Sequence, residues 1–556
     1  MKNFLLMTTI IFFVSLQSQA SVADFLAMCR DSNLPSLERQ SIKAINDAVQ
    51  GQLESFPLSC EEIALRLQEK KKLYFADHRS SFAAPKEPLG ALKPLIALDW
   101  IEEISIAYLA EEIGIFDVAP LAKMPALKKL ELLIGSQPLV NLDQLSSLES
   151  LELNSSQLID FSHFAKLKEL RVTAYHSHNG QIGNFALIDT AIKLEALDVS
   201  GYRLATFKDF TIFSKLIALK RLSIAGLDFN RIDSLHELRE LQNLEIRNST
   251  IDELLMPEKI NSKLLNLELN YVEIGKGVDS IRKFSQLKKL VFTNSQLRYA
   301  SFLKNLFELE ELDLSNNIIG IVNDIAMLTK LRKVDLEKNN LSNSGYFKNL
   351  VNMEFLNLSE NEFDEIDGVK NMSDLRELNI RKNKIYSIKP LNVLINLNKL
   401  TLDDNRISDV SVLENLVGLH QVKSLNLSHN KIFDSQGLAS FRKLKELNLS
   451  DNSLHDIFEI GLLSELESLV LNRNNLTDIS RLGNLTKLSA LDLSHNRISD
   501  VSPLVSLKNI SYYIALSYNN ISDISPLEAL KGQQFYLHLH ENPLTSDYCP
   551  AGTCQF

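Results

Sequence analysis

Cysteine is scarce in this chain of 556 residues, and none of its four copies lies between Cys60 and Cys549. Cys29 and Cys60 lie near one end of the sequence, and Cys549 and Cys554 lie at the other. An even, paired count is typical of disulfides in an oxidising compartment, whereas a zinc site needs four ligands that converge in space. We therefore predict one disulfide at each end and no metal site.

A surplus of basic residues is also missing. The 70 Asp and Glu residues outnumber the 59 Lys and Arg residues, which gives a formal net charge of −11. The longest basic run is the "EKKK" at 69–72. Nucleic acids and anionic lipid surfaces bind basic faces, so the balance argues against both as partners.

The short motifs of common enzyme classes are absent as well. The segment "GKGVDS" (275–280) lacks the spacing of a phosphate-binding loop, and "HELRE" (236–240) lacks the second histidine of a zinc protease. No G-x-S-x-G elbow occurs. His176 and His178 share the loop-like segment 174–185, where two histidines are more typical of a solvated loop than of a metal site. We expect no catalytic residue and no cofactor; an active site assembled across distant segments is the alternative.

Only one hydrophobic run is long, "FLLMTTIIFFVSL" at 4–16. Lys2 precedes this run, and Ser18 and Ala20 supply small residues at the −3 and −1 positions of a cleavage site. This order is the pattern of a secretory signal peptide, and the run is short for a membrane span. We predict that residues 1–20 are a signal peptide and that the chain is exported without stable membrane insertion; a retained anchor is the alternative.

What the sequence has in abundance is one repeated pattern, L-x-x-L-x-L-x-x-N-x-L. Copies include "LRKVDLEKNNL" (331–341) and "LKELNLSDNSL" (444–454). The Asn positions follow each other mostly at 22 residues: Asn317, Asn339, Asn361, Asn383, Asn405, Asn430, Asn452, Asn474, Asn496, Asn519 and Asn542. Upstream, Ser156, Leu227, Ser249, Val272 and Ser295 occupy the same position. We count about 18 to 20 copies between residues 95 and 545, which indicates a solenoid.

The two halves of each repeat predict different structures. In "LDLS" apolar residues alternate with polar ones, which favours a short strand with one buried face. In "NRISDVSPLVSL" (496–507) the apolar residues recur every three positions, which favours 3-10 turns over α-helix. The repeated Asn is expected to satisfy main-chain groups where the chain leaves the strand, so we assign it a structural role.

This pattern resembles the leucine-rich repeat, and the compact 22-residue form resembles the repeats of bacterial internalins and of SDS22-like phosphatase regulators. The resemblance implies an α/β fold: a curved, horseshoe-shaped solenoid with a parallel β-sheet on its concave face and 3-10 turns on its convex face. It also implies recognition of a protein partner. The chain shows no C-terminal wall-anchoring signal, so we expect it in the periplasm or secreted.

Caps are expected at both ends, because a terminal repeat would expose its core. We predict a helical N-terminal cap and lead-in over 21–94, with helices at 36–51 and 59–75, and a C-terminal cap over 546–556. Ser59 and Glu62 form a capping-box pattern at the start of the second helix. Cys29–Cys60 would tie the first cap, and Cys549–Cys554 the second.

Two sets of outward residues are candidates for partner binding. One is the acidic part of the column in the middle of the strands, Glu245, Glu268, Asp313 and Asp335, which would suit a cationic partner. The other is an aromatic group in the last strands, Tyr513, Tyr518, Tyr536, His538 and His540. Each set has a structural explanation as well: Asp and Asn commonly fill the column, and the rings would cover the end of the stack.

We therefore predict a non-enzymatic, exported protein that binds a protein partner on its concave face, for recognition, adhesion or scaffolding. A glycan ligand is left open. The alternative functions are regulation of an enzyme, as in the phosphatase regulators, and an enzyme with an active site assembled across repeats.

Overall fold

The computed structural model describes the chain in segments. They are residues 16–36, 39, 42–45, 48, 59–68, 71–75, 92–106, 115–133, 139–173, 184–201, 206–207, 210–256, 263–545, 549 and 553–556. The chain divides into two compact units, Met1–Lys283 and Phe284–Phe556.

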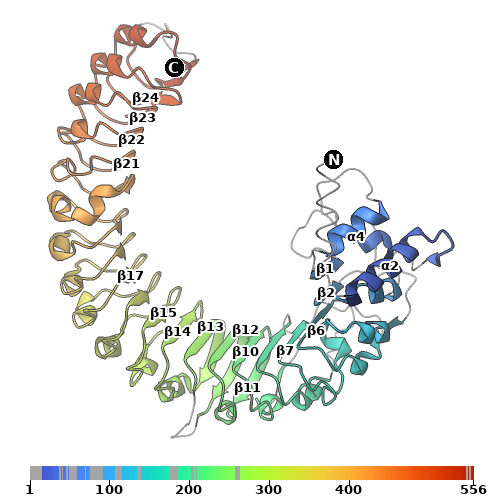
Figure 1. The fold of residues 1–556 in the computed structure, drawn as a ribbon. Helices are drawn as coiled ribbons and strands as arrows, with labels where there is room; N and C mark the ends of the chain where they lie inside the picture. The colour runs from blue at the N-terminus through green and yellow to red at the C-terminus, as the bar shows by residue number, and fades with distance from the viewer. Residues whose placement is uncertain are drawn as a thin grey trace. The chain divides into compact units, whose positions relative to one another are not determined.

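The first unit is a ladder of parallel strands that follows the helices of an N-terminal cap (Figure 1). The cap contains α2 (Leu16–Arg30), α4 (Cys60–Gln68) and β1 (Lys72–Phe75). The ladder continues from β1 through β2 (Glu103–Ile106), β4 (Lys129–Leu132), β6 (Ser150–Asn154), β7 (Glu169–Thr173), β8 (Ala196–Ser200), β10 (Arg221–Ala225), β12 (Asn243–Leu254) and β13 (Asn266–Lys276). Shorter strands pair beside it: β3 (Phe116–Asp117) with β5 (Leu139–Val140), and β9 (Thr206–Phe207) with β11 (Asp228–Ile232).

The second unit holds two successive parallel ladders. The first runs through β14 (Lys289–Thr293), β15 (Glu311–Asp313), β16 (Lys333–Asp335), β17 (Phe355–Asn357), β18 (Glu377–Asn379) and β19 (Lys399–Thr401). The second runs through β20 (Ser424–Asn426), β21 (Glu446–Asn448), β22 (Ser468–Val470), β23 (Ala490–Asp492), β24 (Tyr513–Ala515), β25 (Tyr536–His538) and β26 (Thr553–Gln555).

Within each unit the strands line the concave side, and the 3-10 turns line the convex side (Figure 1). The period-three segments form 3-10 helices as predicted, for example Ser502–Ser506 and Ser525–Leu530, each with Pro in its first turn. Between strand and turn, the repeated leucines form a continuous core; Leu491, Leu493 and Leu504 are fully buried. Burial of these side chains supplies the main stabilisation, at about 25 cal/mol per Å² of apolar surface removed from water.

The repeated Asn is structural, as the sequence predicted. At Asn383 the side-chain oxygen accepts the N–H of Phe363 at 3.0 Å. The amide nitrogen donates to the carbonyls of Leu358 and Ile380 at 2.9 and 3.1 Å. The same set of bonds recurs at each Asn position from Asn339 to Asn519, so the amides form a ladder that pairs main-chain groups of successive repeats.

At two of the upstream positions that lack the Asn, Ser249 and Val272, longer strands replace it. β12 and β13 run straight through the positions of Ser249 and Val272, and these two residues are paired in register. Because the strands continue, their main-chain groups bond to each other and need no side-chain amide. These two upstream repeats therefore satisfy the same main-chain groups in a second way.

The N-terminal cap agrees in part with the prediction. The capping box is present: Ser59 N–H donates to Glu62 Oε2 at 2.8 Å, and Glu62 N–H donates to Ser59 Oγ at 3.3 Å. The described residues of the predicted helix 36–51, namely 36, 39, 42–45 and 48, are helical. A disulfide joins Cys29, at the end of α2, to Cys60, at the start of α4.

The predicted helix 59–75 is wrong in its second half. Helix α4 ends at Gln68, and Lys72–Phe75 forms β1, which pairs with β2 in parallel. Leu73 and Phe75 alternate with polar neighbours and are buried, so a strand buries both on the core face where a helix would separate them. Lys72 and Lys129 both contact Glu103 (2.6 and 2.8 Å), which fastens this first strand to the ladder.

The predicted signal peptide falls mostly outside the described residues, which begin at Leu16 in α2, so this assignment remains a prediction. No helix in the described segments is both long and apolar enough to cross a lipid bilayer. At the other end, a disulfide joins Cys549 to Cys554, and β26 extends the ladder beyond β25.

Candidate functional site

The central residues of the strands form one outward column in each ladder, as the sequence predicted. Glu245 lies opposite Glu268 in the first unit, and Asp313 lies opposite Asp335 in the second. Further along the second unit, Ala515 lies opposite His538. Like-charged neighbours at strand spacing repel, so the contacts of the acidic residues decide whether they are available to a partner.

In the first unit, Glu245 is already engaged. Its carboxylate accepts the hydroxyl of Ser223 at 3.1 Å and lies 3.0 Å from Arg247 Nε. Glu268 is its neighbour in register on β13. The contact with Arg247 offsets part of the negative charge of Glu245, which the sequence analysis proposed as a site for a cationic partner.

In the second unit, the column residues cap the backbone. Asp313 Oδ1 accepts the N–H of Ser315, and Asp335 Oδ1 accepts the N–H of Glu337, both at 2.9 Å. Asn357 makes the same bond to Ser359 N–H at 3.1 Å. An Asx side chain that bonds the N–H two residues on is a turn-forming device, which explains why Asp and Asn fill this column without any partner.

Asp335 carries an electrostatic cost in this position. Burial raises the pKa of Asp335 to about 6, and the carboxylates of Asp313 and Glu337 act in the same direction. The folded chain therefore keeps this proton up to about pH 6, whereas the unfolded carboxyl releases it near its ordinary value of 3.8. As a result, the free energy of unfolding is highest, as far as Asp335 is concerned, below pH 3.8, and this contribution is lost as the pH rises to about 6.

We expect Asp335→Asn to raise the free energy of unfolding by about 1 kcal/mol at pH 7, because the amide keeps the cap without the charge. The gain should disappear below about pH 4, where both forms are neutral. Urea unfolding at a series of pH values measures this, with Asp492→Asn as the matched control because its neighbours in the column, Val470 and Ala515, are uncharged. A gain that is independent of pH would contradict the assignment.

The predicted aromatic residues cluster on the last strands. Tyr513 lies opposite Tyr536 in register, and His538 lies on the same strand as Tyr536. Tyr536 is 57% exposed and His540 is exposed, whereas Tyr513 and His538 are half-buried. Burial raises the pKa of the Tyr513 phenol, and the Asp492 carboxylate adds to the rise, so the phenol stays neutral.

The end of the stack beside these rings also carries other contacts. The strand beyond β25 is β26, and Gln555 on it lies 2.7 Å from His538 Nδ1. The buried ring near this end is Phe535. Tyr536 remains largely open to solvent beside these contacts.

Two further aromatic residues near these strands were missed from the sequence. Tyr512 lies directly before Tyr513 and is 66% exposed. The repeat from Asn496 to Asn519 is 23 residues long, one residue longer than the usual 22. His495 stacks on Tyr518 with ring centroids 4.2 Å apart and planes 7° apart. Both His495 and Tyr518 have left-handed backbones (φ 55° and 57°) directly before the repeated Asn. The sequence signal for this pair was their shared position, one residue before Asn496 and Asn519.

Few charged residues occupy the two positions that flank the central leucine in β20 to β25. The outward residues that flank the central leucine of β20 to β25 are Ser424, Asn426, Glu446, Asn448, Ser468, Val470, Ala490, Asp492, Tyr513, Ala515, Tyr536 and His538. Only Glu446 and Asp492 in this set are carboxylates. In β15 to β19 the corresponding positions include Glu311, Lys333, Glu377 and Lys399, which pair as Lys333–Glu311 (2.9 Å) and Lys399–Glu377 (3.1 Å).

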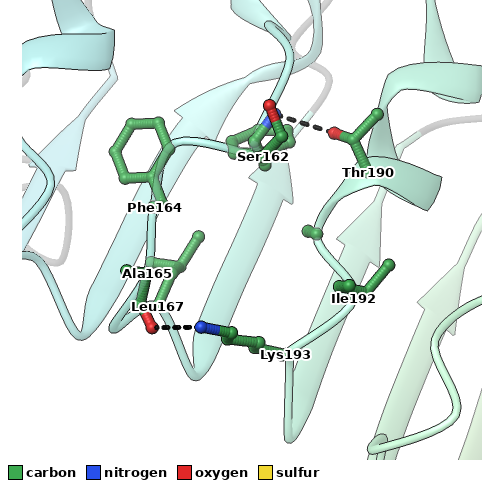
Figure 2. Close-up of a pocket in the computed structure, with 9 residues that line it drawn as sticks. Ser162, Phe164, Ala165, Leu167, Thr190, Ile192 and Lys193 are labelled. Carbon is green, nitrogen blue, oxygen red and sulfur yellow. Dashed lines mark hydrogen bonds between the residues drawn. The ribbon is translucent and has the colours of Figure 1, made fainter.

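A small hollow of about 110 Å³ in the first unit lies between two neighbouring repeats (Figure 2). Its polar groups bond to the chain: Thr190 Oγ1 accepts Phe161 N–H at 2.7 Å, and Lys193 donates to the Ala165 carbonyl at 3.3 Å. Ser162 Oγ lies 3.4 Å from His163 Nδ1, but Asp160 bonds the Ser162 N–H and so caps the turn. A nucleophile–base pair needs the base to be oriented by a third group, and Asp160 does not supply that contact. The segment with His176 and His178 lies outside the described residues.

Comparison with known proteins agrees with the repeat geometry. The family model described as "Leucine Rich repeats (2 copies)" matches residues 464–509, which include β22 and β23. The chain is a leucine-rich-repeat protein. A search of curated proteins found no match.

Two solved structures with TM-scores above 0.5 show the same fold. A TDR receptor is 16% identical with a TM-score of 0.54, and the match covers 88% of this leucine-rich-repeat chain and 92% of the receptor. A chain of the Toll–Spätzle complex from Drosophila is 17% identical with a TM-score of 0.51, over 72% of this chain and 58% of that one. An internalin from Listeria monocytogenes is 23% identical with a TM-score of 0.44, over 62% of this chain and 88% of the internalin.

Proposed function

We propose that this leucine-rich-repeat protein is an exported, non-enzymatic binding protein that holds a protein partner on the concave face of β20 to β25. The observation that carries this proposal is the surface formed by Tyr512, Tyr513, Tyr536, His538 and His540, set among Ser, Asn and Ala. We call this surface the tyrosine patch.

The chemistry of the tyrosine patch favours a protein partner. Tyr offers a large, rigid contact area and a hydrogen-bonding tip at low entropic cost, while Ser and Asn supply adaptable hydrogen bonds. Aromatic residues are also enriched at the centres of protein interfaces, and charged residues are depleted there. By contrast, the acidic column of Asp313 and Asp335 is engaged in backbone caps, so we assign the binding role to the patch.

Export is supported by the two disulfides and by the signal pattern of residues 1–20. An exported chain would not meet an intracellular phosphatase, which disfavours the regulator alternative. Among the solved structures with this fold, one is a TDR receptor and one is a chain of the Toll–Spätzle complex. These roles belong to those proteins, and they illustrate that the fold can support binding.

We expect Tyr513→Ala combined with Tyr536→Ala to weaken partner capture about thirtyfold or more, since loss of a central aromatic residue costs about 2 kcal/mol of binding. The mature chain serves as bait in a native extract of the source organism, and captured proteins are quantified by mass spectrometry. Circular dichroism should stay native, because both side chains lie outside the leucine core.

Tyr386→Ala is the matched control, since Tyr386 is 60% exposed and precedes a 3-10 turn, away from the strands. Full capture by the double variant would contradict the proposal. A loss of thermal stability without a specific loss of capture would show that the rings only stabilise the end of the stack.

A further inference from the structure

The two ladders of the second unit are separated by a lapse in strand pairing. β18 pairs with β19 and β20 pairs with β21, but no pairing joins β19 to β20 within residues 263–545, which are described without a gap. We call the interval between Lys399–Thr401 and Ser424–Asn426 the ladder lapse.

The missing hydrogen bonds can be identified from neighbouring repeats. Asn398 and Lys399 both donate to the Arg376 carbonyl (2.8 and 3.1 Å), and Lys445 and Glu446 both donate to the Lys423 carbonyl (2.8 and 2.9 Å). In the continuous stretch 263–545, no main-chain N–H donates to the Asn398 carbonyl at the lapse.

A second bond is missing at the C-terminal end of β19. Ile380 N–H donates to the Thr401 carbonyl at 3.0 Å, and Leu427 N–H donates to the Asn448 carbonyl at 2.8 Å. The equivalent bond from Leu402 to Asn426 is absent from this stretch, although Leu402 is 0% exposed. Buried main-chain N–H groups without a partner are rare and call for an explanation.

The cause is an insertion of one extra turn. The repeated Asn positions are 22 residues apart on either side but 25 apart from Asn405 to Asn430. The additional residues form a second 3-10 turn, Val417–Gln421, after Ser411–Asn415. A side chain at Gly418 would place its Cβ 2.4 Å from the Leu397 carbonyl oxygen, so this turn packs tightly against the preceding repeat.

The asparagine ladder continues past the lapse. Ile407 N–H donates to Asn430 Oδ1 at 3.0 Å, and the Asn430 amide donates to the Leu402 carbonyl at 3.1 Å. The repeats thus remain joined beyond the strands, while the pairing fails on the strands themselves.

Within the stretch 263–545, the lapse leaves main-chain donors and acceptors without partners, and three of the residues that carry them, Asn398, Ser424 and Asn426, are exposed. The N–H groups of Leu402 and Ser424 and the carbonyls of Asn398 and Asn426 lack the partners that their counterparts have. A peptide group, which carries one donor and one acceptor, complements this set. The side chains at the lapse are Thr401, Ser424 and Asn426, which are uncharged, and Lys399 is paired with Glu377.

We propose that the ladder lapse is a docking point where an extended segment of the partner polypeptide hydrogen-bonds to the main chain of β19 and β20. This rests on the proposed function and adds main-chain recognition to it. Four strand spacings separate β20 from β24, about 20 Å. An extended segment of about six residues spans that distance, so a partner segment with about six residues beyond those bound at the lapse reaches the tyrosine patch.

The test uses the full mature chain and a displayed library of linear random peptides as the probe. We expect enriched peptides that bind the wild-type chain and slow hydrogen exchange at the exposed Ser424 amide. Deleting Val417–Leu419 restores the 22-residue spacing and should close the lapse, with roughly tenfold weaker peptide binding from the loss of about two hydrogen bonds.

Ser424→Pro is a second variant, in case the deletion does not fold. It removes a donor that has no partner in the free chain, so the fold should be retained while peptide binding falls. Ser468→Pro is the matched control for the structure: Ser468 N–H donates to the Lys445 carbonyl at 2.9 Å, so this substitution should destabilise the chain.

Peptides that bind the deletion variant and Ser424→Pro as tightly as the wild type would overturn the inference, and so would a library that yields no enriched peptide. If Tyr513→Ala with Tyr536→Ala abolishes partner capture while the lapse variants capture normally, the proposed function stands and the docking point is refuted.

Discussion

Replacing Asn383 by alanine is expected to lower the free energy of unfolding by about 3 kcal/mol, the upper end of the cost for leaving buried polar groups unpaired. The amide of Asn383 bonds the Phe363 N–H and the carbonyls of Leu358 and Ile380. Alanine removes the donor and the acceptor at once, and water cannot reach the turn freely because Leu358 and Phe363 are fully buried. Urea unfolding monitored by circular dichroism measures the loss.

Asn396→Ala is the matched control. Asn396 is exposed, and its amide donates a single bond to the Ser373 carbonyl at 2.9 Å, so its removal should cost less than about 1 kcal/mol. Asn383→Asp should be at least as harmful as Asn383→Ala, because a carboxylate would face carbonyl oxygens. Equal stability of Asn383→Ala and the wild type would refute the asparagine ladder as a stabilising element.

Removing the N-terminal disulfide, as Cys29→Ala with Cys60→Ala, is expected to cost about 4 kcal/mol. The cross-link spans a sequence separation of 31 residues, and closing a loop of this size restricts the unfolded chain by about that amount. The only tryptophan, Trp100, reports on this cap, because its indole N–H donates to the Leu67 carbonyl at 3.1 Å. Fluorescence during urea unfolding therefore measures the stability of the cap.

The C-terminal disulfide provides the comparison. Cys549 and Cys554 are separated by 5 residues, and so short a loop should contribute only about 2 kcal/mol. Cys549→Ala with Cys554→Ala should leave Trp100 fluorescence unfolding unchanged, since the tryptophan lies in the other unit. Equal losses from the two double variants would contradict the loop-length argument.

The local features of the fold were predictable because they depend on short-range patterns. The L-x-L alternation gave the strands and their outward column, and the period of three gave 3-10 turns such as Ser502–Ser506. The Ser59–Glu62 capping box also follows from neighbouring residues. The strand Lys72–Phe75 was missed, because its pairing with Glu103–Ile106 depends on a partner far along the chain.

The sequence by itself determined the repeat, its period and its structural Asn, since each repeat contains the same leucines and the same turn. Only the tertiary structure decided the use of each outward residue. Asp313 and Asp335 cap main-chain N–H groups, Tyr512 joins Tyr513 on the surface, and the inserted turn before Asn430 interrupts the pairing of β19 with β20. These outcomes depend on contacts between successive repeats, and the sequence of one repeat does not specify what its neighbour leaves unpaired.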